Sequence, residues 1–345
     1  MRYLVTGGAG FIGSNFVARA LSRNDQAIIY DDLSRPGVGA NVDWLRTEHG
    51  ADAVEFVPAK VQDAARLGRA MASVDAVVHL AGQTAVTTSI RDPVADFESN
   101  ARGTLNVLEV ARGLDPPPVV IYASTNKVYG PLDRIPVTET ETRYTFSDRP
   151  FGISEAEPLD FHSPYGCSKG AGDQYVLDYA RIYGLRSVVL RQSCIFGPRQ
   201  MGCEEQGWVA WFLIAAQKRL PIRMYGSGKQ VRDVLFVEDL LDVYDAAIEH
   251  IDVAAGQAYN IGGGPERVLS VWAEFAPLIE RVLGRRPEIQ SEPWRPGDQR
   301  VYVSDIRKAE RDLGWAPEVG VDEAVERLAA WIQENPDLFP PAAGP

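Results

Sequence analysis

The chain has 345 residues and a formal net charge of −12, with 45% hydrophobic and 24% charged residues. This length allows two domains or one large α/β unit. The acidic balance argues against a surface that binds nucleic acid or a polybasic surface that binds a membrane. No stretch approaches the roughly 18 apolar residues of a membrane span. Three cysteines without a C-x-x-C pair and four histidines without ligand spacing predict reduced thiols, a cytoplasmic protein and no metal site.

Short apolar runs alternate with amphipathic stretches through the first half of the chain. The apolar runs are RYLVTG, QAIIYDD, VEFVPA, DAVVHLAG and PVVIYAS, and RSVVLRQS follows later. Apolar strands that alternate with helices predict an α/β fold with a doubly wound parallel sheet, the Rossmann arrangement. We assign residues 1–196 mainly to this domain and 197–345 mainly to a smaller, discontinuous α/β substrate-binding lobe. A stretch at about 231–262 is expected to return to the first domain.

Two segments lie outside this simple alternation. From Pro93 onward, Phe97, Ala101, Leu105 and Leu108 recur at helical spacing, which predicts a helix that buries this stripe. Residues 131–163 are polar and rich in proline, with no period. A segment of that length inside a compact domain is usually a functional loop or disordered.

A glycine-rich turn follows the first predicted strand. In VTGGAGFIG, Gly7, Gly10 and Gly13 open a helix directly after the strand, where backbone N–H groups bind a dinucleotide pyrophosphate. We assign Phe11 and Ile12 of this turn to the same cofactor site.

An acidic residue follows at the distance expected for a dinucleotide site. Asp31 ends the second predicted strand, 18 residues beyond Gly13. A carboxylate there binds the ribose 2′-OH of NAD and repels the 2′-phosphate of NADP. Arg35 lies close by and could stack on adenine or meet a phosphate. NAD is therefore the predicted cofactor.

A tyrosine and a lysine lie one helical turn apart near the start of another predicted helix. Tyr165 and Lys169 share one face at i, i+4 spacing. A neighbouring ammonium favours the phenolate, and a phenolate can take a proton from a sugar hydroxyl while hydride leaves the carbon. Ser124 ends the apolar run PVVIYAS. Thr125 follows it directly and supplies a hydroxyl to the same site.

The order of motifs TGGAGFIG, DDLS, HLAGQ, SNARGT, STNKVYG and YGCSK resembles the extended short-chain dehydrogenase/reductase family of NAD-dependent nucleotide-sugar epimerases and dehydratases. The likeness covers nearly the whole chain. It implies that Thr125, Tyr165 and Lys169 are the catalytic residues. It also implies that Ala81 and Gly82 lie alongside the bound cofactor and that Asn100 supports the active site. One departure is Lys60, where the family usually has an acid for adenine.

The residues after Thr125 bear on the reaction type. Dehydratases of this family read S-T-D-E there and use the two acids for elimination, whereas this chain has Asn126 and Lys127. Epimerisation without elimination is therefore expected. STNKVYG and EEQGWVAWF are further similar to the family's CDP-sugar 2-epimerases, which implies inversion at C2 of a CDP-hexose through a 2-keto sugar. A UDP-hexose 4-epimerase and a non-catalytic NAD- or nucleotide-sugar-binding protein stay open as alternatives.

Several residues are predicted to contact the nucleotide sugar. In the family, arginines at the motifs KQVRDV and RPGDQRVYVSD hold the diphosphate, as a planar guanidinium suits phosphate oxygens. The complete predicted set is Gln83, Thr125, Asn126, His162, Gln206, Trp208, Arg232 and Arg300. For Cys194 we expect a small wall residue. The resemblance also implies a homodimer, with a homotetramer as the alternative.

Overall fold

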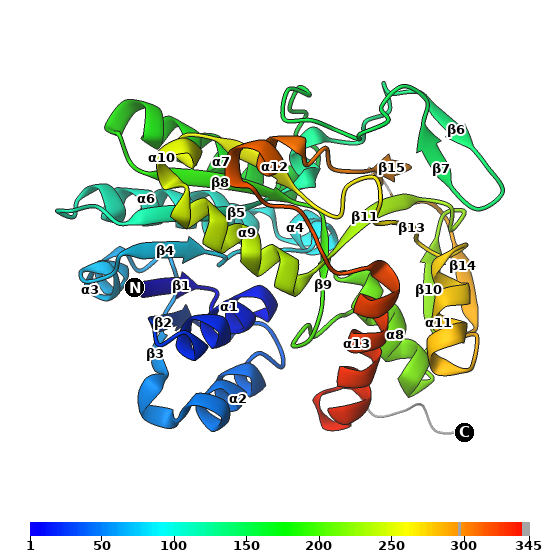
Figure 1. The fold of residues 1–345 in the computed structure, drawn as a ribbon, viewed down its shortest axis with the longest axis horizontal. Helices are drawn as coiled ribbons and strands as arrows, with labels where there is room; N and C mark the ends of the chain where they lie inside the picture. The colour runs from blue at the N-terminus through cyan, green and yellow to red at the C-terminus, as the bar shows by residue number, and fades with distance from the viewer. Residues whose placement is uncertain (296–297, 340–345) are drawn as a thin grey trace.

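The computed structural model describes residues 1–295 and 298–339. Its larger part is a seven-stranded sheet in the order β12-β8-β5-β4-β1-β2-β3, with every pairing parallel (Figure 1). The strands are β1 (Arg2–Thr6), β2 (Gln26–Asp31), β3 (Glu55–Pro58), β4 (Ala76–His79), β5 (Val119–Thr125), β8 (Ser187–Gln192) and β12 (Ala258–Ile261). The central strands are buried along their whole length, as parallel sheets require. The predicted α/β fold is confirmed.

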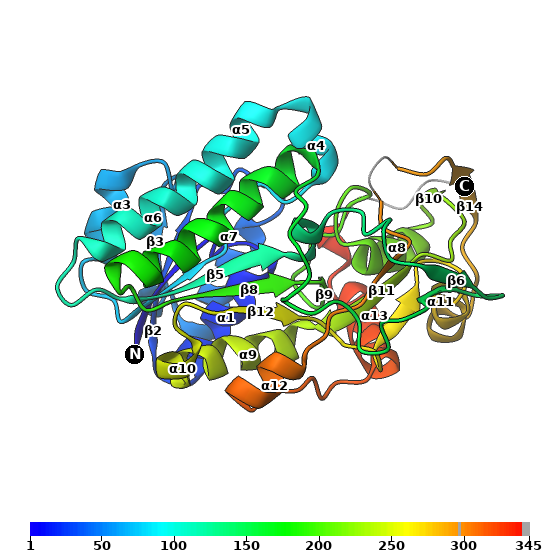
Figure 2. The ribbon, with the colours of Figure 1, turned by 90° about the horizontal axis from the view of Figure 1, so that it is seen from above.

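Helices cover both faces of this sheet (Figure 2). One face carries α3 (Ala64–Met71), α5 (Pro93–Phe97), α6 (Gly103–Arg112) and α7 (Ser163–Tyr183), with α4 (Val86–Arg91) beside them. The other carries α1 (Phe11–Ser22), α2 (Gly39–His49), α9 (Val237–Glu249), α10 (Ile251–Ala254) and α12 (Arg307–Leu313). Two apolar cores result, one on each side of the sheet.

The helix that begins at Pro93 differs from its predicted form. A π-helical turn at Glu98–Arg102 separates α5 from α6. Because a π turn holds an extra residue, a stripe drawn at 3.6-residue spacing does not continue across it. Phe97 is 53% exposed, whereas its neighbour Asp96 is only 1% exposed. Of the predicted stripe, Ala101 and Leu108 are buried.

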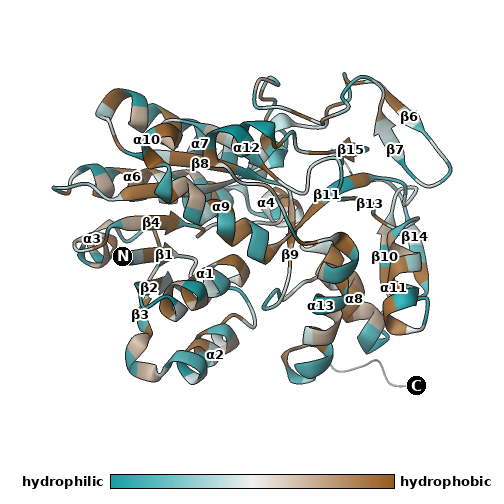
Figure 3. Cartoon of the chain, in the orientation of Figure 1, coloured by the Kyte–Doolittle hydropathy of each residue, from teal (hydrophilic) through white to brown (hydrophobic). Residues whose placement is uncertain are grey.

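A second lobe lies beyond the carboxyl ends of the main strands (Figures 1 and 2). Its strands are β9 (Cys194–Phe196), β10 (Ile222–Tyr225), β11 (Val231–Phe236), β13 (Val268–Ser270), β14 (Ile289–Glu292) and β15 (Val301–Tyr302), and its helices are α8 (Trp208–Lys218), α11 (Phe275–Leu283) and α13 (Val321–Glu334). Figure 3 shows that α8 is hydrophobic along most of its length, because it runs through the core of this lobe. The predicted residue limits of the two domains stay a prediction.

The segment 131–163, predicted as an irregular loop, contains an antiparallel hairpin of β6 (Val137–Glu139) and β7 (Tyr144–Phe146). The Tyr144 N–H donates to the Lys229 carbonyl at 3.0 Å, and Leu132, Ile135 and Ile153 are buried in a small cluster. These contacts with distant residues order the segment, which its local sequence did not indicate. No helix in residues 1–295 and 298–339 combines the length and hydrophobicity needed to cross a membrane.

Candidate active site

The glycine-rich turn connects β1 to α1 at the carboxyl edge of the sheet. Gly7 has a φ of +71° and donates to the Tyr30 carbonyl at 2.8 Å. A Cβ on Gly13 would lie 2.4 Å from the Gly7 carbonyl oxygen, so glycine is required there. Gly10 is the N-cap of α1, and no side chain makes a capping hydrogen bond there. Phe11 and Ile12 form the first turn of that helix. This bare N-terminus, at the point where the strand order reverses, fits a dinucleotide pyrophosphate.

Asp31 and Arg35 follow β2 at the same edge. The two oxygens of Asp31 accept from the N–H groups of Leu33 at 2.8 Å and Ala9 at 3.1 Å. Asp31 therefore lies directly against the glycine-rich turn. Burial raises its pKa, and these two backbone hydrogen bonds oppose that effect. Arg35 donates to the Met201 carbonyl at 3.2 Å; its predicted adenine or phosphate contact stays a prediction.

The segment after β4 adjoins Asn100 of the π turn. Asn100 Nδ2 lies 3.1 Å from the Gln83 carbonyl, 3.1 Å from Asp96 Oδ1 and 3.0 Å from Ser168 Oγ. Its Oδ1 is buried without a hydrogen-bond partner in the described residues. A Cβ on Gly82 would lie 2.5 Å from that oxygen, so only glycine fits beside it. Ala81 donates its N–H to Thr6 Oγ1 at 3.3 Å.

The three residues predicted to be catalytic are all buried at the end of β5 and the start of α7. Thr125, Tyr165 and Lys169 are each less than 9% exposed. The Tyr165 N–H donates to Ser89 Oγ at 3.1 Å, which anchors the first turn of α7. Lys169 Nζ donates to the Ala123 carbonyl at 2.6 Å and lies 4.2 Å from the centre of the Tyr122 ring. Strand end and helix face therefore bring a hydroxyl, a phenol and an amine into one site.

Burial dominates the ionisation of this pair. It raises the pKa of Tyr165 to about 12, although a hydrogen bond with Thr125 opposes the shift. It also lowers the pKa of Lys169 to about 7, against the opposing charges of Asp173 and Asp96. Lys169 Nζ is hydrogen-bonded to the Ala123 carbonyl, and the lysine-stabilised phenolate stays a prediction.

A buried ion pair supports the site from behind. The Arg191 guanidinium donates to both oxygens of Asp173 at 2.9 Å, and Ser124 Oγ donates to the same carboxylate at 2.7 Å. Arg191 also donates to the Tyr129 hydroxyl at 3.0 Å. Side chains of Asp173 and Arg191 are 0% and 5% exposed. Because Asp173 lies one turn after Lys169 on α7, this network fixes α7 against β5 and β8.

Asn126 and Lys127 lie where β5 meets the second lobe. Asn126 is buried, and its Oδ1 accepts a long hydrogen bond from Thr125 Oγ1 at 3.4 Å. Lys127 Nζ lies 3.3 Å from Gln299 Oε1 and 3.9 Å from Asp298 Oδ1. Arg232, almost fully buried, donates to the same Asp298 oxygen at 2.7 Å. Burial and the charge of Arg232 lower the pKa of Lys127. Two cations thus converge on one carboxylate. This leaves a net positive charge, which suits an anionic ligand.

The remaining predicted substrate residues divide into two groups. Trp208 lies near Arg232 and Lys127 through Cys194. Its Nε1 donates to Cys194 Sγ at 3.4 Å. Burial raises the pKa of Cys194, and the charges of Arg232 and Lys127 oppose that effect. Gln206 belongs to the turn before α8. His162 is exposed and faces Asp160 at 3.2 Å. The exposed Arg300 lies over the Tyr144 ring at 5.8 Å, on a groove of about 420 Å³ beside the hairpin, and not with Arg232.

Arg295 was missed from the sequence, although it opens the motif RPGDQR. Its guanidinium stacks 3.9 Å from the centre of the Tyr225 ring and donates to the Glu204 carbonyl at 3.3 Å. Its charge helps to lower the pKa of Asp298 against the effect of burial. Gln83 Nε2, predicted to meet substrate, donates to Asp96 at 2.9 Å. Asp96 was also missed, since the predicted helix stripe placed Phe97 inside.

Residues 198–207, here called the crossing segment, are held by hydrogen bonds from two sides of the site. On one side, Asn15 and Arg35 donate to the carbonyls of Pro198 and Met201 at 3.0 and 3.2 Å. On the other, Glu205 accepts from Thr87 of α4 at 2.5 Å, and Arg91 of the same helix also binds it. The crossing segment therefore connects α1 and the β2–α2 loop with α4.

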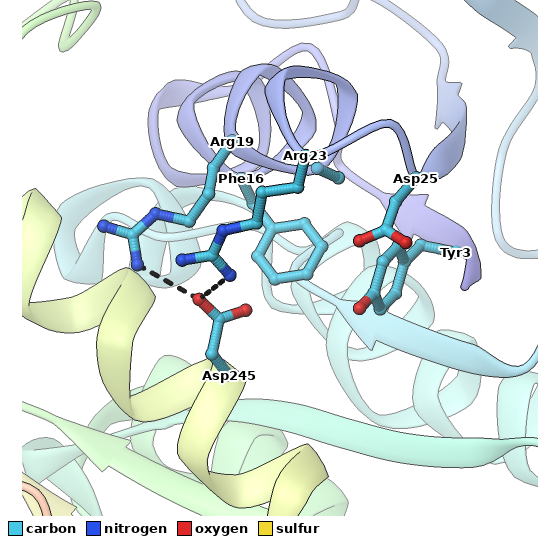
Figure 4. Close-up of a pocket in the computed structure, with 7 residues that line it drawn as sticks. Tyr3, Phe16, Arg19, Arg23, Asp25 and Asp245 are labelled. Carbon is cyan, nitrogen blue, oxygen red and sulfur yellow. Dashed lines mark hydrogen bonds and ion pairs between the residues drawn. The ribbon is translucent and has the colours of Figure 1, made fainter.

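A separate small pocket lies near the amino end of β1, away from all these residues. It is lined by Tyr3, Phe16, Arg19, Arg23, Asp25 and Asp245 among others (Figure 4). Its volume is about 10 Å³, space for one water at most. Asp245 accepts from Arg19 and Arg23 at 3.1 and 2.6 Å, so these charges are already paired. This pocket is structural and holds no substrate.

Fold and site together define a Rossmann-type enzyme with a second, smaller lobe. The family model described as GDP-mannose 4,6 dehydratase matches residues 4–328. CDP-paratose 2-epimerase of Salmonella typhi is 44% identical over 338 residues, covering 96% of this chain and 99% of the relative. The chain belongs to the NAD-dependent nucleotide-sugar epimerase/dehydratase family, which confirms the predicted family and an enzyme of this class.

Solved structures agree with this assignment. UDP-glucose 4-epimerase from Thermotoga maritima, solved with UDP-glucose, has a TM-score of 0.81 and 29% identity, covering 97% of this chain and 99% of that one. The dTDP-glucose 4,6-dehydratase of Streptomyces venezuelae, solved with NAD bound, has a TM-score of 0.84 and 29% identity, covering 99% and 100%. NAD as the cofactor of this family confirms the prediction drawn from the glycine-rich turn.

Proposed function

We propose that this enzyme inverts C2 of a CDP-activated hexose, of the paratose and tyvelose type or CDP-glucose, using a tightly held NAD. The observation that carries the proposal is the pair after Thr125. An amide bonded to Thr125 and a lysine paired with Asp298 and Gln299 replace the two acids that elimination needs. The 44% identity with a CDP-paratose 2-epimerase supports CDP and C2.

Each catalytic residue has a role that follows from its place. NAD, when bound, accepts hydride from the sugar carbon and returns it. Thr125 Oγ1 bonds the reacting oxygen and orients it toward Tyr165. The Tyr165 phenolate takes the hydroxyl proton and gives it back on reduction. Lys169, protonated, balances the phenolate and binds cofactor hydroxyls. Inversion requires that the 2-keto sugar expose its other face before reduction.

The second lobe is assigned the nucleotide part of the substrate. Arg232, which donates to Asp298 at 2.7 Å, and Lys127 are proposed to bind the diphosphate. Trp208 and Gln206 are proposed to border the sugar, as is Asn126. Gly7, Gly10, Gly13 and Asp31 are proposed to hold NAD. His162 and Arg300 stay predicted substrate residues without a contact that supports them.

The test uses purified protein without added NAD. CDP-paratose, CDP-glucose and UDP-glucose are incubated separately, and the product sugars are assigned by proton NMR. A new C2 epimer of a CDP-sugar is the expected result. Inversion at C4 of UDP-glucose would overturn the C2 assignment in favour of a 4-epimerase. NAD that stays bound while none of the three sugars reacts would favour a non-catalytic binding protein.

We further propose a homodimer, with a homotetramer as the alternative, located in the cytoplasm. Large apolar side chains are exposed on α4, α5 and α7, three neighbouring helices on one face of the sheet (Figure 2): Ile90, Val94, Phe97, Tyr175, Ile182 and Tyr183. Val94 alone is 70% exposed. A concentration of apolar surface on adjacent helices is typical of an interface. The three free thiols fit a reducing compartment.

Val94→Glu is expected to convert the oligomer to monomer at micromolar concentration, because a carboxylate would be buried without a partner. Sedimentation velocity measures the change. The control is Val253→Glu, at a valine 57% exposed on α10 across the sheet, which should leave the sedimentation coefficient unchanged. A monomeric parent protein, or two variants that behave alike, would contradict this interface.

A further inference from the structure

Arg199 of the crossing segment lies between two tryptophans that belong to different parts of the fold. Its guanidinium carbon is 4.0 Å from the centre of the Trp44 ring on α2 and 5.5 Å from the centre of the Trp331 ring on α13. Trp44 packs against a core of the main sheet, and Trp331 belongs to the core of the second lobe. Figure 1 shows the chain after β9 between α2 and α13. One cation is therefore shared by both lobes, at distances where aromatic faces attract it.

The backbone around Arg199 is bound by side chains from the cofactor side of the molecule. The carbonyls of residues 198, 199 and 201 accept from Asn15 at 3.0 Å, from Asn41 at 3.5 Å and from Arg35 at 3.2 Å. Arg199 itself has a φ of +69°, a region that a residue with a long side chain seldom adopts. Such a conformation persists where the surroundings hold it, so this part of the chain has a fixed course.

Two of these donors also bind the glycine-rich turn. Asn41 is fully buried, and the same Nδ2 donates to the Ala9 carbonyl at 3.0 Å. The Ala9 N–H donates in turn to Asp31 at 3.1 Å. Asn15 Nδ2 likewise donates to the Phe11 carbonyl, in the first turn of α1, at 2.8 Å. The crossing segment and the turn that is proposed to hold NAD are thus bonded to the same two amides.

We propose that Arg199 is a positioning residue whose guanidinium, held between Trp44 and Trp331, keeps the crossing segment against the glycine-rich turn and so slows the release of NAD. The inference rests on the proposed place of NAD at that turn, and it needs no assumption about which sugar is the substrate. It adds to the hydrogen bonds of Asn15, Asn41 and Arg35 a contact that reaches the second lobe.

The chemistry of the side chain suits this role. A guanidinium is planar and stacks on aromatic rings, and its attraction to them grows when water is excluded. Burial lowers the pKa of Arg199, against the charge of Glu48, which is the sign of partial desolvation. A bound dinucleotide leaves when the segments around it open locally, and a segment held from two lobes opens less often. Removing the shared cation should therefore speed release.

The experiment compares Arg199→Asn with Arg219→Asn. Both arginines have a positive φ, +69° and +54°, and asparagine tolerates this region better than most residues, so neither change adds backbone strain. Arg219 is the exposed C-cap of α8. Each purified, NAD-loaded protein is mixed with an excess of isotope-labelled NAD. After desalting, the unlabelled NAD that remains on the protein is measured against time by mass spectrometry.

Exchange about ten times faster than in the parent is expected for Arg199→Asn, and parental exchange for Arg219→Asn. Arg199→Lys, which keeps the charge and loses the planar group, should give an intermediate rate. Parental exchange in Arg199→Asn, or equally fast exchange in both asparagine variants, would overturn the proposal.

A double-variant cycle separates this role from a general loss of stability. Trp331→Leu alone should also speed exchange, and adding Arg199→Asn to it should speed exchange little further, because both changes remove the same contact. Fully additive effects would overturn the proposal. Asp31→Asn tests the place of NAD by itself. Parental exchange in that variant would contradict the proposed cofactor site, whereas faster exchange there with parental exchange in Arg199→Asn would overturn this inference alone.

Discussion

Tyr165→Phe is expected to lower kcat by about two to four orders of magnitude, the range that general acid–base catalysis contributes. The reason is geometric, because the phenol is buried at the end of β5 beside Thr125, and burial raises its pKa to about 12. Phenylalanine keeps the ring and its packing and removes the only hydroxyl assigned to proton transfer. KM and the amount of NAD that copurifies should change little. Steady-state kinetics measure kcat and KM, and the cofactor released by acid measures the amount of bound NAD.

Tyr175→Phe is the matched control for that substitution. Tyr175 lies on the same helix, α7, but is 44% exposed and faces outward. We expect wild-type kcat from it. If Tyr165→Phe kept more than about a tenth of wild-type kcat, Tyr165 would not be the proton carrier. The Thr125 hydroxyl would then have to exchange its proton with solvent.

Asp173→Asn is expected to lower the free energy of unfolding by about 3–5 kcal/mol, the range for removing one partner of a buried ion pair. The variant leaves Arg191, whose side chain is 5% exposed, with a charge that nothing nearby balances. Burial already opposes that charge, and it is the hydrogen bonds and charge of Asp173 that raise the Arg191 pKa. Urea unfolding followed by circular dichroism measures the loss.

The control is Asp178→Asn, at an exposed pair on the same helix. Arg181 and Asp178 are 74% and 41% exposed, and such surface pairs contribute about 0–1 kcal/mol. Equal midpoints for Asp173→Asn and Asp178→Asn would show that the Asp173–Arg191 pair does not stabilise the fold. A double variant with leucine at 173 and methionine at 191 should regain part of the stability, since it leaves no unpaired charge.

The sequence predicted those parts of the fold that depend on local pattern. Apolar strands buried on both faces, the glycine-rich turn and Asp31 depend on residues close together in the chain, and their spacing was enough. Phe97 was predicted to be buried, but it is exposed and Asp96 is buried in its place. The π turn that shifts the helical register is held by contacts of Asn100 with Gln83 and Ser168, which local spacing does not reveal. The hairpin in 131–163 forms against Lys229, far away in sequence.

The second lobe shows the same limit. Arg300 and Arg295 lie in one motif, and nothing in their spacing indicates which would lie near the charge of Asp298. The structure distinguishes them by their neighbours, Tyr144 for Arg300 and Tyr225 for Arg295. The cluster of Lys127, Arg232 and Asp298 joins three distant segments, so its charge balance exists only in the folded protein.

The crossing segment bears on how fast bound cofactor exchanges with solution. We expect a dinucleotide held at the glycine-rich turn to be released more slowly while the bonds from Asn15 and Arg35 on one side, and those to Glu205 on the other, hold this segment in place. Exchange is therefore expected to be slower than turnover. The proportion of oxidised to reduced cofactor in a freshly purified sample would then record the redox state of the cell in which the protein folded.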